Sequence, residues 1–370
     1  MARLALPLYA IYHKRIGGTE SAIYNLIKGL SLISETAIDL YYSDTKRLAP
    51  DFLKWADTTR NVRQIITRPL GSSKNIRFLE EIKFSFLHGD ADLFLYPNYF
   101  CPPTHRRDDA KLATVLYDIQ YKSFPQYHSR MRRMWLNFYL KTLFNTADYI
   151  YILSEFERQN ILKYFGRRAA DKCVVTYVAI EWSRLEGNLN GKARQGHSPY
   201  ILSVCHQFPH KNIPTLLKAF DKLSHKNEDI DLVLVGKASE DNILFVQNNL
   251  SESAARRVHF TGFVSDAELG DWYRNALIFV SPSLYEGFGM PPVEAMGLGI
   301  KTIVSYAGSM PEITLHKAEY VMNPLDVREW VGAIEKNIAS PKLSYDIASE
   351  IRARYDMLSV AERYLDPLQR

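Results

Sequence analysis

Residues 281–299 read SPSLYEGFGMPPVEAMGLG, and this stretch determines how the rest of the chain is interpreted. An apolar run ends near Ser281, and Pro291 and Pro292 then predict the first turn of a helix, where proline's missing N–H is tolerated. The free N–H groups of a helix start and the helix dipole together favour an anion. Gly289, just before the prolines, allows a ligand to approach the backbone. The stretch therefore predicts an anion-binding turn between a strand and a helix.

Two acidic residues, Glu286 and Glu294, lie eight positions apart around this turn. One precedes the predicted helix and the other is expected in its first turn, so both can face one pocket. Because carboxylates accept hydrogen bonds from hydroxyl groups, one of them could reach a sugar and the other a ribose diol. The alternative for Glu294 is a first-turn carboxylate that only complements the helix dipole.

Short apolar runs rich in branched and aromatic residues recur along the chain and predict buried strands. They lie at residues 4–12, 93–96, 112–117, 149–153, 200–204, 232–235, 277–281 and 302–304. Between many of them the apolar residues repeat with helical spacing, for example at 213, 216, 217 and 220. Strands that alternate with helices predict an α/β fold with doubly wound parallel sheets.

The 370-residue length predicts two domains. Residues 184–198 read RLEGNLNGKARQGHS, which is rich in glycine and poor in large apolar side chains, and a strand restarts at Tyr200. We therefore expect a first domain at 1–185, a linker at 186–198 and a second domain at 199–354. In such sheets ligands bind beyond the carboxyl ends of the strands, so we expect two Rossmann-like domains that face a central cleft.

Charge is distributed unevenly along the chain. Residues 1–190 contain 27 Lys and Arg against 19 Asp and Glu, and the remainder is slightly acidic. The basic half predicts either an anionic partner, such as a membrane surface or a phosphorylated acceptor, or only a solvated basic face.

The three cysteines are far apart, which argues against a disulfide framework or a structural zinc site and suits a reducing compartment. No apolar run reaches the ~18–20 residues that span a bilayer, and we expect a cytoplasmic protein.

The run from Glu286 to Glu294, EGFGMPPVE, resembles the E-x7-E signature of retaining glycosyltransferases of the GT-B fold, specifically family 4. The resemblance implies that Glu294 binds the ribose of a nucleotide sugar and that Glu286 contacts the transferred sugar. It also implies that the turn formed by Phe288, Gly289, Met290 and Pro291 meets the sugar and the phosphates.

Other segments of the second half are similar to the same family in the same order. Residues 200–220 resemble its first strand and helix, which implies that Lys211 binds the donor phosphates. The family often has an arginine where this chain has Cys205, and His206 follows as a further candidate donor contact. Phe263 and Val264 correspond to a loop that lies against the base. Glu312 is interpreted as a structural helix-start carboxylate.

The first half resembles the family more loosely. Gly17 and Gly18 follow the first predicted strand, and the resemblance implies that they approach the donor phosphates and the acceptor. Tyr117 stands where the family has a histidine that faces the sugar, and Asp118 is kept; we expect both to position substrate. Ser154 is expected to cap a helix. A final helix at about 355–370 is expected to pack back on the first domain.

These similarities predict a retaining, metal-independent hexosyltransferase without a cofactor, comparable to bacterial polysaccharide mannosyltransferases. The favoured donor is GDP-mannose and the acceptor is a saccharide or a lipid-linked saccharide, with no role for nucleic acid. Two alternatives remain open: a catalytically weakened nucleotide-sugar-binding subunit of a glycosyltransferase complex, and another GT-B enzyme such as a sugar-nucleotide epimerase.

Two further segments have competing interpretations. Asp229 and Asp231 form a D-x-D pair of the kind that binds a metal diphosphate, but they precede a strand, the wrong end for a ligand in a parallel sheet. The segment 130–141 is basic and aromatic. It predicts either peripheral contact with the inner face of an anionic membrane or, preferentially, a core helix that buries Trp135, Phe138 and Leu143 beneath a basic outer face.

Overall fold

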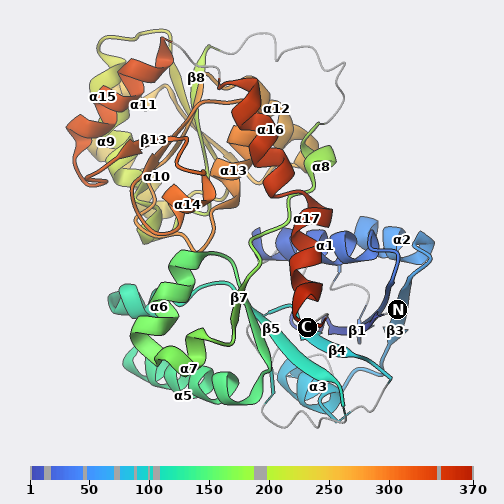
Figure 1. Ribbon diagram of the computed structural model, residues 1–370. Coiled ribbons are helices and arrows are strands. Elements are labelled where there is room, and N and C mark those ends of the chain that lie inside the picture. The colour runs from blue at the N-terminus through green and yellow to red at the C-terminus, as the bar shows by residue number, and fades with distance from the viewer. Residues whose placement is uncertain are drawn as a thin grey trace. The chain divides into compact units, whose positions relative to one another are not determined.

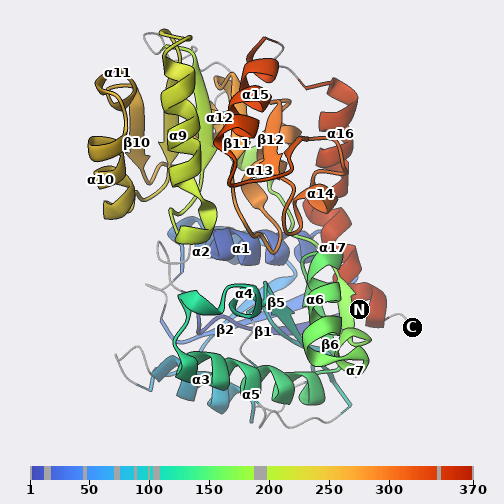
Figure 2. The ribbon, with the colours of Figure 1, turned by 90° about the vertical axis from the view of Figure 1, so that its left-hand side faces the viewer.

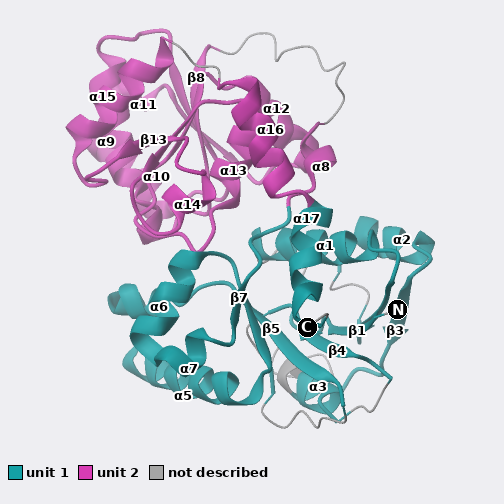
Figure 3. Cartoon of the chain, in the orientation of Figure 1, with its two compact units in different colours: residues 1–179, 357–370 teal, residues 180–356 magenta. Residues whose placement is uncertain are grey.

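The computed structural model describes residues 2–11, 18–44, 48–70, 76–86, 90–98, 101–102, 109–186, 198–339 and 343–368. The chain divides into two compact units (Figure 3). Unit 1 comprises residues 1–179 and 357–370, and unit 2 comprises residues 180–356. Each unit is built around its own sheet (Figure 1).

Within the described residues, unit 1 has a seven-stranded parallel sheet in the order β3-β2-β1-β4-β5-β6-β7. The strands are β1 Ala2–Pro7, β2 Thr36–Tyr42, β3 Val62–Ile66, β4 Leu93–Tyr96, β5 Lys111–Leu116, β6 Tyr149–Ile152 and β7 Cys173–Val175. The helices are α1 Gly18–Ser31, α2 Pro50–Thr58, α3 Ile76–Phe84, α4 Gln120–Ser123, α5 Arg130–Thr146, α6 Glu155–Phe165, α7 Arg167–Ala170 and α17 Met357–Leu365. Both ribbon views show α3 and α5 on one face of the sheet and α1 on the other (Figures 1 and 2).

Unit 2 has a six-stranded parallel sheet in its described residues, in the order β10-β9-β8-β11-β12-β13. The strands are β8 Tyr200–Val204, β9 Asp231–Val235, β10 Val258–Gly262, β11 Ile278–Ser281, β12 Thr302–Ser305 and β13 Glu319–Val321. The helices are α8 Trp182–Glu186, α9 Ile213–Ser224, α10 Glu240–Asn249, α11 Glu252–Ala255, α12 Asp266–Arg274, α13 Met290–Gly297, α14 Met310–Ile313, α15 Val327–Ile338 and α16 Tyr345–Arg354.

Both faces of the unit 2 sheet are buried, which explains why its strands read as continuous apolar runs. In β9, Leu232 and Leu234 join a core cluster on one face, whereas Val233 and Val235 join a second cluster on the other. Successive side chains of a strand point to opposite faces, so an apolar run is needed when helices cover both. The prediction of doubly wound α/β architecture is confirmed.

The strand order reverses once in each sheet. The reversal lies between β1 and β4 in unit 1 and between β8 and β11 in unit 2. At such a point the loops that leave the two neighbouring strands run in opposite directions and open a crevice at their carboxyl ends. The loops after β8 and β11 are therefore the first place to look for a ligand site in unit 2.

The units divide at Ala179–Ile180, a few residues before the predicted end of the first domain at 185. Helix α8 belongs to unit 2 because Trp182 packs there: its indole N–H donates to the Arg352 carbonyl at 3.2 Å. The predicted linker lies mostly at residues 187–197, outside the described residues. Among the described residues, no helix is both long enough and apolar enough to cross a membrane.

Helix α17 belongs to unit 1, where it packs against α1. The contact is close at Gly29, because a β-carbon added there would lie 2.4 Å from the Met357 carbonyl oxygen. The glycine therefore lets two helices from opposite ends of the chain approach each other.

We predict that Gly29→Ala lowers the unfolding midpoint by several degrees, since overpacking at such a contact costs about 1–3 kcal/mol. The matched control is Gly332→Ala in α15, where a new β-carbon meets no atom within 4 Å. That substitution should leave the midpoint unchanged or raise it slightly, because alanine favours a helix over glycine. Thermal unfolding followed by circular dichroism compares the two variants, and equal midpoints would contradict the packing argument.

Candidate functional site

A lysine and a glutamate meet at the reversal point of the unit 2 sheet. Lys211 ends a 3-10 turn, Pro209–Lys211, in the loop after β8, and Glu286 lies in the loop after β11. The Lys211 Nζ lies 2.5 Å from Glu286 Oε1, and both side chains are largely buried. A backbone hydrogen bond joins the same loops, since Leu284 N donates to the His210 carbonyl at 2.8 Å. The structure thus brings together two of the predicted site residues.

The neighbouring loop after β12 fixes the shape of the Glu286 loop. The Ser309 hydroxyl oxygen lies 3.0 Å from the Glu286 carbonyl oxygen and 2.9 Å from that of Phe288. Gly308 has a φ of 61°, and a β-carbon there would lie 2.8 Å from Glu286 N. Only glycine allows the two loops to approach this closely. Glu312 lies in the short helix α14 beyond them, at the helix-start position expected for it.

The start of α13 differs from the sequence-based expectation. Gly289 has a φ of 95° and precedes the helix, which begins at Met290. Glu294 is therefore its fifth residue and lies beyond the first turn, so the interpretation as a first-turn carboxylate is wrong. Because Pro291 and Pro292 have no backbone N–H, this turn also offers fewer donors to an anion than a helix start normally does.

Glu294 is buried, with 2% of its surface exposed, and its carboxylate is held by two protein partners. Arg184 of α8 forms an ion pair with its Oε1, and the Tyr273 hydroxyl of α12 donates to Oε2 at 2.9 Å. Arg184 also pairs with Asp266 at 2.7 Å. Burial and the adjacent Glu294 charge raise the pKa of Tyr273, so its hydroxyl stays protonated and donates. Sequence reasoning missed both partners.

The loop after β8 also carries Cys205 and His206. Burial raises the pKa of the Cys205 thiol to about 12, so it is neutral at physiological pH. Burial and the nearby Lys211 and Lys237 lower the pKa of His206, so its imidazole is neutral there too. His206 can donate or accept a hydrogen bond but does not replace an arginine's charge. Lys237, just after β9, is a cation that the sequence interpretation did not single out.

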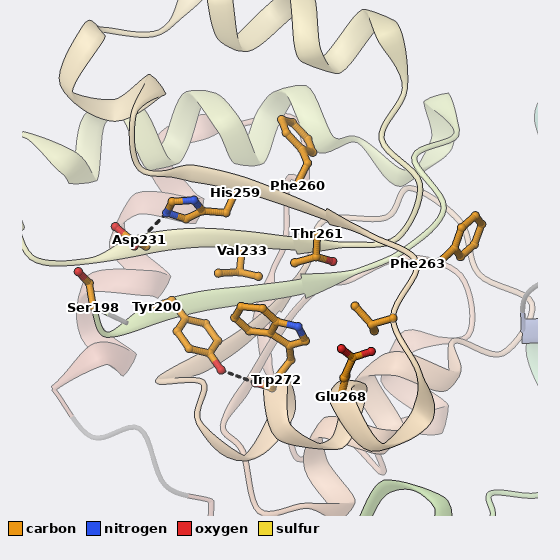
Figure 4. A pocket seen from close by; sticks show the side chains of 11 residues that line it. Ser198, Tyr200, Asp231, Val233, His259, Phe260, Thr261, Phe263, Glu268 and Trp272 are labelled. Atoms are coloured by element: carbon orange, nitrogen blue, oxygen red, sulfur yellow. Dashed lines mark hydrogen bonds and ion pairs between the residues drawn. The ribbon is translucent and has the colours of Figure 1, made fainter. Parts of the chain in front are cut away.

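A pocket of ≈390 Å³ lies along the face of β8, β9 and β10 (Figure 4). Of the predicted residues it is lined by Phe263 and Val264 but not by the Lys211–Glu286 pair. His259 and Asp231 pair at 3.0 Å at its other end. Asp231 is the first residue of β9, as expected from the sequence, which places the D-x-D pair at the amino end of the strand. No group of three metal-binding side chains occurs in the part of the chain that the structure describes.

In unit 1, Tyr117 and Asp118 follow β5. The Tyr117 hydroxyl donates to the Pro97 carbonyl at 3.1 Å, and burial raises its pKa well above the usual value. Asp118 is exposed, and its Oδ1 accepts from Gln120 N at 3.0 Å. The Tyr117 hydroxyl therefore ties the loop after β5 to Pro97, while Asp118 in the same loop is exposed. Gly18 opens α1, whereas Gly17 lies outside the described residues.

A buried glutamate that sequence reasoning missed supports this loop. Glu157 of α6 accepts from Ile119 N at 3.3 Å. Ser154 caps α6 by accepting from Glu157 N, as predicted.

Comparison with known proteins gives a family match over part of the chain and a fold for the whole of it. The family described as Glycosyl transferases group 1 matches residues 188–354. The O-antigen chain mannosyltransferase B of Escherichia coli is 31% identical over 241 residues, which are 62% of this chain and 61% of that protein. The O-antigen chain mannosyltransferase RfbU of Salmonella typhimurium is 28% identical over 242 residues, 65% of each chain. The chain thus spans less than two thirds of these relatives.

Two solved structures show the same fold over the whole chain. Sucrose-phosphate synthase from Thermosynechococcus elongatus has a TM-score of 0.75 at 18% identity and covers 100% of this chain and 98% of its own. Anabaena HepE, in complex with UDP and glucose, has a TM-score of 0.71 at 17% identity and covers 100% of both chains. The predicted GT-B fold is confirmed.

We predict that Arg184→Ala destabilises the protein by roughly 3–5 kcal/mol, because it leaves the buried Glu294 carboxylate without its cation. The double variant Arg184→Met with Glu294→Met should recover most of this loss. The control Lys336→Ala removes an exposed pair with Glu319 and should cost less than about 1 kcal/mol. Urea unfolding measures all three, and an equal loss in Arg184→Ala and Lys336→Ala would refute the pairing.

We predict an acid-sensitive contribution from His210, whose pKa is lowered to about 4 by burial and by Lys211, against the opposing charge of Glu286. Between its usual value of 6.5 and about 4, the unfolded chain binds a proton that the folded chain does not, so stability falls as the pH falls through this range. His210→Gln should reduce the loss between pH 7 and 4.5 by on the order of 1–2 kcal/mol, allowing for partial exposure. Unfolding midpoints across this range test the sign, and an unchanged pH profile in the variant would contradict it.

Proposed function

We propose that this chain, whose residues 188–354 belong to the glycosyl transferases group 1 family, transfers a hexose from a nucleotide-diphosphate sugar to an acceptor. The observation that carries the proposal is the Lys211–Glu286 pair at the sheet reversal of a GT-B fold, 2.5 Å between Nζ and Oε1. A cation and a carboxylate at that point can serve the two parts of such a donor, its diphosphate and its sugar.

In the proposed mechanism, the diphosphate of the donor replaces Glu286 as the ion-pair partner of the Lys211 ammonium. The glutamate is then free to accept hydrogen bonds from the sugar hydroxyls. As the bond from the anomeric carbon to the phosphate oxygen lengthens, negative charge grows on the diphosphate and positive charge on the sugar. Lys211, Lys237 and the N–H groups near Gly289 stabilise the negative charge on the diphosphate. Glu286 stabilises the positive charge on the sugar. Such preorganised charge usually contributes a large part of an enzyme's rate enhancement.

No protein nucleophile is assigned. We propose that the acceptor attacks the face from which the diphosphate departs, so that the anomeric configuration is retained and the departing phosphate receives the acceptor's proton. Neither a metal ion nor a cofactor is needed in this scheme, since Lys211 and the backbone donors meet the leaving charge.

Glu294 is proposed to bind the ribose diol of the nucleotide. Its two oxygens accept from Arg184 and Tyr273, but a carboxylate has about four acceptor positions, so two hydroxyls can still be accommodated. The two protein partners fix its orientation, which lowers the entropy cost of binding. Phe263 and Val264, which line the pocket, are proposed to lie against the base. His206 is beside Phe263, with 5.5 Å between the two ring centres.

The finer assignment is a mannosyltransferase of family 4 that uses GDP-mannose, supported by relatives that are named O-antigen mannosyltransferases. We propose a saccharide or lipid-linked saccharide acceptor in bacterial polysaccharide synthesis. Unit 1 would bind it with Asp118, on a loop held by Tyr117, with Gly18 at the start of α1, and with Gly17, its neighbour in sequence. The protein would act in the cytoplasm, in peripheral contact with the inner face of the membrane.

A nucleotide-sugar-binding subunit with weakened catalysis is the second candidate. It is favoured by the Tyr117 hydroxyl, which is engaged with the Pro97 carbonyl, and by the neutral Cys205 in the donor loop. Purified protein that binds a donor but neither transfers nor hydrolyses it would support this candidate, and a product that is an epimerised nucleotide sugar would indicate a GT-B epimerase.

We predict that one of GDP-, UDP-, ADP- and dTDP-sugars, with GDP-mannose favoured, raises the melting temperature without divalent metal, since a ligand of the folded state stabilises it by mass action. Glu294→Ala should abolish this shift. Glu286→Gln should change donor affinity by less than about threefold but lower kcat by about a hundredfold or more, because its charge acts on the transition state.

The control is Asp231→Ala, at the amino end of β9, which should leave both the shift and turnover unchanged. A shift that requires Mn²⁺ and disappears in Asp231→Ala would instead support a metal site at the D-x-D pair. Absence of any shift with all four sugars would refute the proposed donor site.

A further inference from the structure

The outer side of α5 carries an apolar stripe in unit 1. Met131, Met134 and Phe138 are 80%, 72% and 73% exposed, and Trp135 is about half exposed. The sequence-based expectation that Trp135 and Phe138 enter the core is therefore wrong, although Leu143 does. The helix has apolar residues on both sides, and the side with Leu143 is the one that packs on the sheet.

The stripe lies opposite the buried side of the helix. At 100° per residue, Met131, Met134, Trp135 and Phe138 fall within about 100° of arc. The buried residues Tyr139, Leu140, Leu143 and Phe144 occupy the opposite arc. They hold α5 on the sheet, so the stripe is presented by a helix that is already folded.

Positive charge flanks the stripe. Residues 119–147 contain five Lys and Arg and no Asp or Glu. Arg130 and Lys141 lie on one flank of the stripe and Arg132 on the other, and all three are exposed. A partner that complements both the apolar stripe and the flanking cations must offer an apolar layer next to an anionic one. The headgroup boundary of an anionic bilayer has this arrangement.

The size of the stripe favours a bilayer over a protein partner. The stripe from Met131 to Phe138 covers two turns of one helix, about 11 Å. Its four side chains would supply only part of the about 800 Å² that each partner buries in a stable protein interface. A few large side chains on one helix are sufficient for insertion about 5–10 Å into the headgroup region. Helix α3, on the same face of the sheet (Figure 2), adds an exposed Leu79.

We propose that α5 is an in-plane membrane anchor. Its Met131, Met134, Trp135 and Phe138 side chains enter the headgroup boundary of an anionic bilayer, and Arg130, Arg132 and Lys141 contact the lipid phosphates. The anchor deepens the proposed function, because it would hold the enzyme beside a lipid-linked acceptor, but lipid binding itself requires no donor and no catalysis.

Flotation of the full chain with vesicles tests the anchor. We expect binding to phosphatidylcholine vesicles that contain about 30 mol% phosphatidylglycerol, and at least tenfold weaker binding to pure phosphatidylcholine. The triple variant Met131→Ser, Met134→Ser, Phe138→Ser should lower the bound fraction at least fivefold. Its control is Tyr345→Ser, which removes an equally exposed side chain from unit 2 and should bind like the wild type.

The charge contribution has its own matched pair. Arg130→Gln with Arg132→Gln should weaken binding to the anionic vesicles about thirtyfold, which corresponds to about 1 kcal/mol for each of the two cations. Arg167→Gln with Arg168→Gln removes two exposed cations from α7 of the same unit and should have little effect. Equal losses in the two pairs would mean that net charge alone attracts the vesicles, which overturns the assignment to α5.

Trp135 reports directly on insertion. Its fluorescence should shift to the blue with anionic vesicles and be quenched by brominated lipid, and Trp135→Phe should remove that response while the other tryptophans remain. No vesicle binding, or binding that the triple variant retains, would overturn the proposal. The proposal would also be overturned if the wild type is a dimer without lipid and the triple variant is a monomer, since the stripe would then join two copies of the chain.

The donor-induced melting shift separates the two proposals. The triple variant should keep it, because no substituted residue lies in unit 2. A wild type that binds vesicles but shows no shift with any nucleotide sugar would refute the proposed function and leave the anchor intact.

Discussion

The neighbouring positions of β8 and β11 are the constraint on which the proposed donor site depends. These strands are separated by more than seventy residues of chain, yet the sheet order makes them hydrogen-bonded partners. Because all strands of the sheet are parallel, the loops that leave them emerge at one edge. Lys211 can reach Glu286 only through this arrangement, and the Leu284–His210 backbone bond and the Ser309 contacts keep it in place.

Charge balance then distinguishes the two carboxylates. Glu286 is paired with a lysine, a compact cation on a flexible stem that can change its partner. Glu294 is paired with an arginine and a protonated tyrosine in the interior, where separation of charges is costly. The geometry therefore suits Glu286 to a contact that changes during a reaction and Glu294 to one that stays fixed. The same nine-residue run supplies both residues, but the structure gives them different freedom.

The sequence predicted the fold and the turn before α13 in the candidate site, because both depend on short-range signals. Buried parallel strands require continuous apolar runs, and the turn from Glu286 to Glu294 is encoded within nine residues. Arg184 was not predicted as a partner of Glu294, because 110 positions separate them and only the packing of α8 in unit 2 brings them together. Glu294 lies just beyond the first turn of its helix rather than in it, since helix starts are uncertain by one or two residues.

Helix α5 shows a different limit of sequence reasoning. Periodicity identifies the helix, but it carries two apolar arcs, and the sequence does not show which of them packs on the sheet. Selection of the Leu143 side leaves methionine, tryptophan and phenylalanine toward the outside, flanked by arginine and lysine. Exposed apolar side chains scattered singly over a surface need no explanation, but a stripe on successive turns does. Only Trp135 of the stripe also packs inward, where its ring stacks on that of the buried Tyr139 with 5.4 Å between the ring centres. Because the opposite arc already anchors the helix in the core, an external apolar phase accounts most directly for the exposed remainder of the stripe.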